Sequence, residues 1–245
     1  MTDIRVYQDS NALAQAAAEL IIHQAAAARA ARGRFDIALS GGSTPRKTFE
    51  LLADKEHSLR INWMATNVFW GDERCVPPDH PESNYRMARQ VLLDHVPLPA
   101  EQIYRMQGEL TPATAADHYE QILQSHFADG SGSSNQAILD LVLLGLGEDG
   151  HTASLFPGTA ALQEKDRLVV ANYVPQMDKW RLTLTYPCIN AARNVAFLVS
   201  GAAKAGILQQ VIGGRGSPKL LPSQLVAPAH GKLIWLVDEA AAAGL

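Results

Sequence analysis

Short runs of aliphatic residues alternate along this chain with longer segments in which apolar residues recur every three or four positions. The aliphatic runs predict strands at 4–8, 35–39, 67–70, 138–144, 168–171, 181–185, 194–200 and 232–238. The amphipathic segments predict helices at 11–31, 45–53, 83–95, 111–127 (or from 114) and 203–212, and a short one at 239–245. Alternation of this kind predicts an α/β fold, a mainly parallel sheet with helices on both faces.

Length and composition are those of a chain that buries a large core. With 245 residues, of which 47% are hydrophobic, it has enough apolar surface for one large core or two fused halves. We find no internal repeat and no clear boundary, so we expect one domain over 1–245. The Ser/Gly-rich stretch at 129–135 favours a surface loop over a linker.

Charge and cysteine usage exclude several classes of partner. The formal net charge is −4 with both signs spread along the chain, so we expect no nucleic-acid binding. No apolar run approaches a membrane span, and the first residues lack the pattern of a signal peptide. The two cysteines, Cys75 and Cys188, suit neither a disulfide framework nor a zinc site. We therefore expect a cytoplasmic protein without a metal and without a membrane partner.

The most informative segment is 138–158, where an aliphatic run ends in a loop with three glycines and one histidine. A run of this kind is typical of a strand buried on both faces of a parallel sheet. Ligand sites of such sheets lie at the carboxyl ends of the strands. His151 is therefore expected at the place where an open α/β protein carries out its chemistry, with Glu148 and Asp149 beside it to orient it or hold its charge.

The same loop also matches a nucleotide-binding pattern. Gly145, Gly147 and Gly150 fit the G-x-G-x-x-G spacing that follows the first strand of dinucleotide-binding folds. The two acids between the glycines would repel a pyrophosphate, and Pro157 interrupts the helix that should follow. We therefore reject a nicotinamide cofactor on this pattern.

A second strand ends in a loop suited to a phosphate. Small residues and hydroxyls follow the strand at 35–39, and a helix follows them, with Thr44 as its expected cap and Pro45 in its first turn. Glycines let backbone amides face inward, and a helix N-terminus favours an anion. The competing interpretation is a plain tight turn. The predicted phosphate contacts are Ser40, Gly41, Gly42, Ser43, Thr44 and Arg46.

Two further strand ends carry charge. Asp72, Glu73 and Arg74 follow the strand at 67–70, either as ligand contacts or as a solvated turn with an internal ion pair. Ser83 and Asn84 could cap the next helix or contact a ligand. Lys204 lies near a helix start, where its positive charge is unfavourable unless an anion binds there. An exposed, solvated lysine is the alternative.

The motifs together resemble a known family. Ser-Gly-Gly-Ser-Thr-Pro at 40–45, Trp-Gly-Asp-Glu-Arg at 70–74, Ser-Asn-Tyr at 83–85, Gly-Glu-Asp-Gly-His-Thr-Ala-Ser-Leu-Phe-Pro-Gly at 147–158 and Ser-Gly-x-x-Lys at 200–204 occur in this order. The chain resembles the family of glucosamine-6-phosphate isomerases and 6-phosphogluconolactonases over nearly its whole length. Arg74, where the deaminases usually have tyrosine, favours the lactonases within it.

The resemblance implies a fold and an activity. It implies a three-layer Rossmann-like sandwich, similar to glucosamine-6-phosphate deaminase, and a hydrolase of the pentose phosphate pathway that needs no cofactor. The partner would be a small sugar phosphate lactone, 6-phospho-D-glucono-1,5-lactone, and the oligomeric state, monomer or homodimer, stays open. His151 would be the general base and Asp149, or less certainly Glu148, its orienting acid.

Other roles stay open under this resemblance. Arg74 would support either the lactone oxygen or the phosphate, and Lys204 would join the phosphate loop. Asp72 would contact the substrate, or would be the proton-transfer base if the chain were a deaminase or isomerase. A sugar-phosphate sensor without catalysis is a third hypothesis, but it has no need of the acid pair beside His151.

Overall fold

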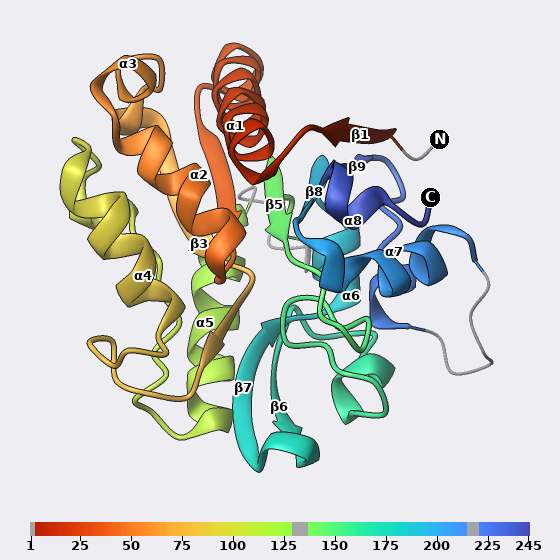
Figure 1. The fold of residues 1–245 in the computed structure, drawn as a ribbon. Helices are drawn as coiled ribbons and strands as arrows, with labels where there is room; N and C mark the ends of the chain where they lie inside the picture. The colour runs from red at the N-terminus through yellow and green to blue at the C-terminus, as the bar shows by residue number, and fades with distance from the viewer. Residues whose placement is uncertain (1–2, 129–136, 215–220) are drawn as a thin grey trace.

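A parallel six-stranded sheet forms the centre of the molecule in the computed structural model, which describes residues 3–128, 137–214 and 221–245 (Figure 1). Its strand order is β1-β9-β8-β5-β2-β3, and all its neighbouring strands run parallel. The predicted 129–135 loop lies outside the described residues. The strands are β1 (Asp3–Tyr7), β2 (Phe35–Leu39), β3 (Thr66–Trp70), β5 (Leu141–Leu144), β8 (Asn194–Val199) and β9 (Lys232–Asp238).

Helices cover both faces of this sheet, which confirms the three-layer prediction. One face packs against α1 (Ser10–Arg32), α2 (Ser43–Ala53) and α4 (Asn84–Val91). The other face packs against α5 (Pro112–Phe127), α6 (Tyr186–Asn190), α7 (Ala205–Ile212) and α8 (Glu239–Ala242). Consecutive strand residues alternate between the two resulting cores, as Ile37 and Ala38 do. The short helix α3 (Lys55–Ser58) follows α2.

A small antiparallel sheet, β4-β7-β6, lies beside the main one. It is formed by β4 (Asp72–Arg74), β6 (Val169–Val174) and β7 (Lys179–Leu184). The aliphatic pattern predicted strands at 168–171 and 181–185, but it did not separate them from the parallel sheet. Parallel neighbours need a crossover of a dozen or more residues. The turn between β6 and β7 is far shorter, so these two strands pair antiparallel.

Two predicted helix starts had different outcomes. Ser83 caps α4, since its Oγ accepts a hydrogen bond of 3.1 Å from the amide of Arg86, as predicted. Thr44 is not the cap of α2, and that prediction was wrong. The helix begins earlier, at Ser43, after Gly42 with φ of 105°, and no side chain caps it. Glycine adopts this backbone conformation without strain, so Gly42 occupies the cap position. Because glycine has no side chain, the first amides of α2 are left without a side-chain cap.

No helix in the described part of the chain is long and apolar enough to cross a membrane.

Candidate active site

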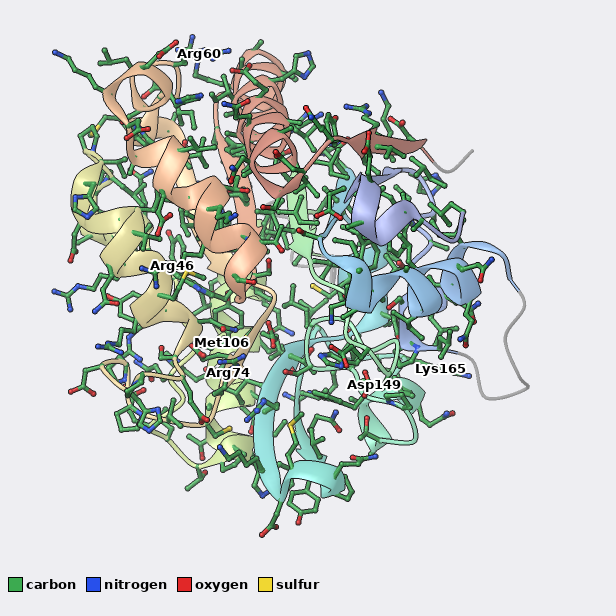
Figure 2. All side chains as sticks on the ribbon, viewed as in Figure 1. Arg46, Arg60, Arg74, Met106, Asp149 and Lys165 are labelled. Carbon is green, nitrogen blue, oxygen red and sulfur yellow. The ribbon has the colours of Figure 1, made fainter. Side chains whose placement is uncertain are left out.

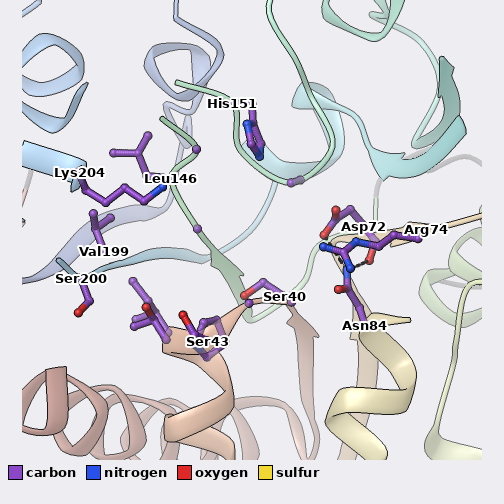
Figure 3. Close-up of a pocket in the computed structure, with 18 residues that line it drawn as sticks. Ser40, Ser43, Asp72, Arg74, Asn84, Leu146, His151, Val199, Ser200 and Lys204 are labelled. Carbon is purple, nitrogen blue, oxygen red and sulfur yellow. Dashed lines mark hydrogen bonds between the residues drawn. The ribbon is translucent and has the colours of Figure 1, made fainter. Parts of the chain in front are cut away.

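A cavity of about 300 Å³ opens at the carboxyl ends of β2, β5 and β8 (Figure 3). This is the end of a parallel sheet at which ligand sites of α/β proteins lie. The loops after these strands contribute most of its wall, and β4 and α4 complete it. Its lining residues are Ser40, Gly41, Gly42, Ser43, Thr44, Pro45, Asp72, Arg74, Asn84, Gly145, Leu146, Gly147, His151, Ala153, Leu198, Val199, Ser200 and Lys204.

His151 is held in the cavity wall by Asp149. The ring Nδ1 lies 2.5 Å from Oδ1 of Asp149, and the His151 amide donates to the same oxygen at 3.1 Å. The ring also stacks on Phe156 with centroids 4.1 Å apart. Because Nδ1 is engaged by the carboxylate, Nε2 is the nitrogen free to exchange a proton with a ligand.

The carboxylate of Asp149 is suited to this role. Burial acts to raise its pKa, but the hydrogen bonds from the ring and amide of His151 outweigh burial and lower the pKa of Asp149. A carboxylate that stays ionised stabilises a protonated imidazole beside it. Asp149 thus holds the ring of His151 in one orientation, which is the geometry that a histidine base and an orienting acid require.

Gly147 allows the ring to occupy this position. A Cβ at residue 147 would lie 2.0 Å from Nδ1 of His151, far inside contact distance. Gly147, one of the glycines that match a dinucleotide pattern, is therefore explained by a different cause. It keeps space for the imidazole between the end of β5 and the cavity.

The loop after β2 presents amides and hydroxyls to the cavity. Gly41 is required because a Cβ there would lie 1.9 Å from Oδ1 of Asn84. The side chain of Ser40 is buried, and its Oγ has no hydrogen-bond partner in the described structure. Ser43 and Thr44 begin α2, whose free amides favour an anion. The predicted phosphate loop therefore lies in the cavity wall, with an unpaired hydroxyl beside it.

Lys204 lines the cavity from the segment that follows β8. Its Nζ lies 3.8 Å from Oε1 of Glu148, whose side chain is 72% exposed. Glu148 thus contacts Lys204, whereas Asp149 contacts His151. Arg46 lies on α2 outside the cavity lining (Figure 2), where its Nε donates to Glu50 at 2.9 Å. The structure therefore brings Lys204, but not Arg46, to the predicted phosphate site.

The acid pair at 72–73 is buried and hydrogen-bonded. Oδ2 of Asp72 accepts from Oγ of Ser154 at 2.7 Å, and its Oδ1 accepts from Nδ2 of Asn84 at 3.3 Å. Glu73 accepts from the amides of Asn84 and Tyr85, both at 2.8 Å, and so binds the N-terminus of α4. Burial raises the pKa of Glu73 against these hydrogen bonds. Asp72 lines the cavity, whereas Glu73 holds α4 in place.

Sequence reasoning missed Ser154, which joins the His151 loop to the small sheet. Besides its bond to Asp72, its amide donates to Oγ1 of Thr183 at 3.3 Å and its carbonyl accepts from Nδ2 of Asn172 at 2.9 Å. The preceding Ala153 has φ of 47°, an uncommon value for a residue with a Cβ. A lone serine after a histidine gives no signal in the sequence, because its three partners come from distant segments.

The described residues contain no group of three or more His, Cys, Asp or Glu side chains placed to hold a metal ion. What the cavity contains is an oriented histidine between two positively charged side chains, Lys204 and Arg74, and a helix N-terminus. Such a site can deprotonate a water molecule or a hydroxyl next to a bound anion.

Comparison with known proteins gives concordant results. The model of the family "Glucosamine-6-phosphate isomerases/6-phosphogluconolactonase" matches residues 8–235. A 6-phosphogluconolactonase of Nostoc is 44% identical over 243 residues, covering 99% of this chain and 98% of that protein. The structure of 6-phosphogluconolactonase from Trypanosoma cruzi has a TM-score of 0.87 at 32% identity, covering 100% and 97% of the two chains. A monomeric glucosamine-6-phosphate deaminase, 20% identical with a TM-score of 0.81, shares the fold.

Proposed function

We propose that this chain, which belongs to the family of glucosamine-6-phosphate isomerases and 6-phosphogluconolactonases, hydrolyses 6-phospho-D-glucono-1,5-lactone to 6-phospho-D-gluconate. The reaction is a step of the oxidative pentose phosphate pathway. The observation that carries the proposal is the position of His151 in the cavity wall, 2.5 Å from Asp149 and across from an anion-binding loop. The names of the relatives point to the same substrate.

In the proposed mechanism His151 activates water. Nε2 accepts a proton as the water oxygen bonds to C1 of the lactone, and the carbonyl oxygen becomes an oxyanion. The bond from C1 to the ring oxygen then breaks, and the ring oxygen takes the proton from His151. The new carboxylic acid ionises to the product carboxylate. Asp149 stabilises the imidazolium between the two proton transfers, and general base catalysis of this kind contributes about 10²–10⁴-fold to the rate.

The phosphate would bind at the N-terminus of α2. Gly41 to Thr44 supply amides and hydroxyls there, and Lys204 supplies a charge that pairs, within the described part of the chain, with the exposed Glu148. The unpaired Oγ of Ser40 would gain a ligand oxygen as its partner. Asp72 would contact a sugar hydroxyl through the part of its carboxylate that faces the cavity.

The deaminase hypothesis has less support from the same geometry. In that reaction Asp72 would transfer protons, but both of its oxygens already accept hydrogen bonds, from Ser154 and Asn84. These two hydrogen bonds leave fewer lone pairs of the carboxylate for a substrate proton. A sensor without catalysis would not need the pairing of His151 with Asp149.

One assay separates the three hypotheses. Lactone made freshly from glucose 6-phosphate is offered to the protein, and its disappearance is compared with spontaneous hydrolysis. Glucosamine 6-phosphate is offered in parallel, and ammonia is measured. We expect rapid loss of lactone and no ammonia. Ammonia release would support the deaminase, and binding of both compounds without turnover would support the sensor.

A further inference from the structure

The cavity has positive charge on two opposite walls, with His151 between them (Figure 3). On one wall Lys204 lies beside the end of β8 and faces the N-terminus of α2. On the other wall Arg74 projects from β4 next to Asp72 and Asn84. A substrate with a single phosphate needs only one of these walls for its charge in the ground state.

A second arginine, Arg181, lies next to Arg74 in the small sheet. In the β4–β7 ladder Arg74 lies directly opposite Arg181, so the two side chains extend from the same face of the small sheet. Like charges in this arrangement are destabilising. Arg181 is only 9% exposed, so its charge has little water around it. Arg74 lines the cavity, whereas Arg181 does not.

Neither arginine has an acidic partner. Within the described residues no carboxylate oxygen lies within 4.0 Å of either guanidinium, although such pairs occur for many other arginines of the chain. Arg74 donates to the carbonyl of Glu82. Arg181 donates to the carbonyl of Trp180 at 3.4 Å and to Sδ of Met177 at 3.7 Å, which are long contacts to neutral acceptors.

The nearest carboxylates already interact with other side chains. Asp72 accepts from Ser154 and Asn84, and the Glu82 carboxylate pairs with Lys179 at 3.0 Å. Burial, and after it the charge of Arg74, lower the pKa of Arg181, while Asp72 and Glu82 act in the other direction. A guanidinium nevertheless stays protonated at neutral pH. The protein therefore maintains a buried positive charge on Arg181 next to a second one on Arg74. An anion bound beside Arg74 would reduce the repulsion between them.

We propose that Arg181 is a positioning residue that acts through Arg74, making this wall selective for the negative charge that forms at C1 of the lactone and remains as the product carboxylate. The inference rests on the proposed function and adds to it the direction in which the substrate lies. Repulsion from Arg181 keeps the guanidinium of Arg74 over the cavity, and the buried charge increases the attraction for an anion.

The oxyanion end is favoured over the phosphate end for two reasons. The phosphate already has a site on the other wall, made of backbone amides, hydroxyls and Lys204. Hydrolysis then creates a second negative charge at the other end of the same molecule, first on the oxyanion and then on the carboxylate. A contact that strengthens as this charge develops accelerates the chemical step.

Two ligands that differ only at C1 test the proposal. Both 6-phosphogluconate and glucitol 6-phosphate are open-chain sugar phosphates, but only the first carries a carboxylate at C1. Their dissociation constants are measured by calorimetry for the parent, Arg181→Met and Arg181→Lys. Arg89→Met is the matched control, since it removes an exposed arginine paired with Asp94. Thermal melts of all variants accompany the titrations.

We expect Arg181→Met to weaken binding of 6-phosphogluconate about tenfold and to leave glucitol 6-phosphate almost unchanged. Arg181→Lys should keep most of the preference, because it keeps the charge. The melting temperature of Arg181→Met should stay equal or rise, since an unpaired buried charge is removed. In turnover, kcat should fall with little change in KM.

Equal weakening of both ligands would place the phosphate on this wall and overturn the proposal. Unchanged binding of both ligands, together with a lower melting temperature, would make Arg181 a structural residue and also overturn it. Because binding is measured without turnover, these outcomes do not depend on the lactonase assay. A parent that binds the two ligands equally well would contradict the inference even if it hydrolyses the lactone.

Discussion

The two ends of the main sheet differ in how completely their buried polar groups are hydrogen-bonded and paired. At the amino end, Asp36 in β2 accepts from Asn67 at 2.8 Å, from His126 at 2.9 Å and from Arg34 at 2.9 Å. Asp140, just before β5, accepts from the amide of Asp36 at 2.9 Å and also binds Arg32. Both acids are buried, and each has its charge neutralised by neighbours.

At the carboxyl end several polar groups lack such partners. Ser40, four residues after Asp36, is equally buried, yet its Oγ has no partner in the described structure. Among the described residues, no carboxylate lies within 4.0 Å of the buried Arg181, and the carboxylate nearest to Lys204 in an ion pair is that of Glu148 at 3.8 Å. A polar group that is buried and unpaired costs stability. From this comparison we expect the amino end to stabilise the fold and the carboxyl end to be completed by a ligand.

Replacing His151 should have the largest effect, and only on catalysis. We expect His151→Asn to lower kcat about 10²–10⁴-fold, because general base catalysis is lost. Binding of 6-phosphogluconate and the melting temperature should stay close to those of the parent. Steady-state kinetics, calorimetry and a thermal melt measure the three quantities. A folded variant with near-normal kcat would remove His151 from the role of base.

Replacing Asp140 should have the opposite profile. Asp140→Ala leaves the amide of Asp36 unpaired and Arg32 without its acid, which should cost about 3 kcal/mol of unfolding free energy. The kcat of the folded fraction should not change, since Asp140 lies at the far end of the sheet. Urea denaturation and active-site titration measure the two effects. A loss of kcat in fully folded protein would contradict the division between the two ends.

Gly147→Ala should show how strongly the rate depends on the position of the His151 ring. The new Cβ would lie 2.0 Å from Nδ1 of His151, so the ring must move. A displacement of about 1 Å at a reacting group can cost about 10²-fold in rate. We expect kcat to fall by roughly that factor, with phosphate binding preserved. Gly206→Ala is the control, because Gly206 does not line the cavity and nothing lies within 4 Å of a Cβ there.

The smallest predicted effect is on the pH dependence of stability. Burial acts to raise the pKa of Asp36, but the interactions with His126, Asn67 and Arg34 outweigh it and lower the pKa below its usual value. The stabilisation is therefore present above the pKa of the unfolded chain and is lost as pH falls through the lower folded value. Asp36→Asn should be less stable by about 1–2 kcal/mol at pH 7.

Below about pH 4 the difference between Asp36→Asn and the parent should shrink, because the unfolded parent chain then takes up a proton at Asp36 before the folded parent does. Urea denaturation of both proteins at pH 7 and pH 3 measures it. A difference that stays constant over this range would mean that the ionised form of Asp36 does not contribute to stability.

Much of the architecture could be predicted from periodicity. The buried strands of the main sheet are continuous aliphatic runs, and their helices are long and amphipathic, so local pattern and final structure agree. The small sheet could not be separated in advance. Its strand β4 has the sequence Asp-Glu-Arg, and only pairing with β7 makes it a strand.

The contacts of the active site also fall into those that the sequence indicates and those that it does not. Residues within one loop, such as Asp149 and His151, have their contact set by local geometry, so sequence indicates it. Arg46 was expected to face the phosphate, but the helix turns it towards Glu50 one turn on. The partners of Ser154 lie on other strands, and so does Arg74, which lies opposite Arg181. Contacts of this kind depend on register, which a single sequence does not show.

A crystal structure of the His151→Asn variant with 6-phosphogluconate tests the central claim most directly. The account predicts the phosphate at the amides of Gly41 to Thr44 near Lys204, the carboxylate near Arg74, and a ligand oxygen bonded to Oγ of Ser40. The cluster around Asp36 and Asp140 should be unchanged. A ligand bound elsewhere, or one that leaves Ser40 and Arg74 without new partners, would contradict the claim that the carboxyl end is completed by its substrate.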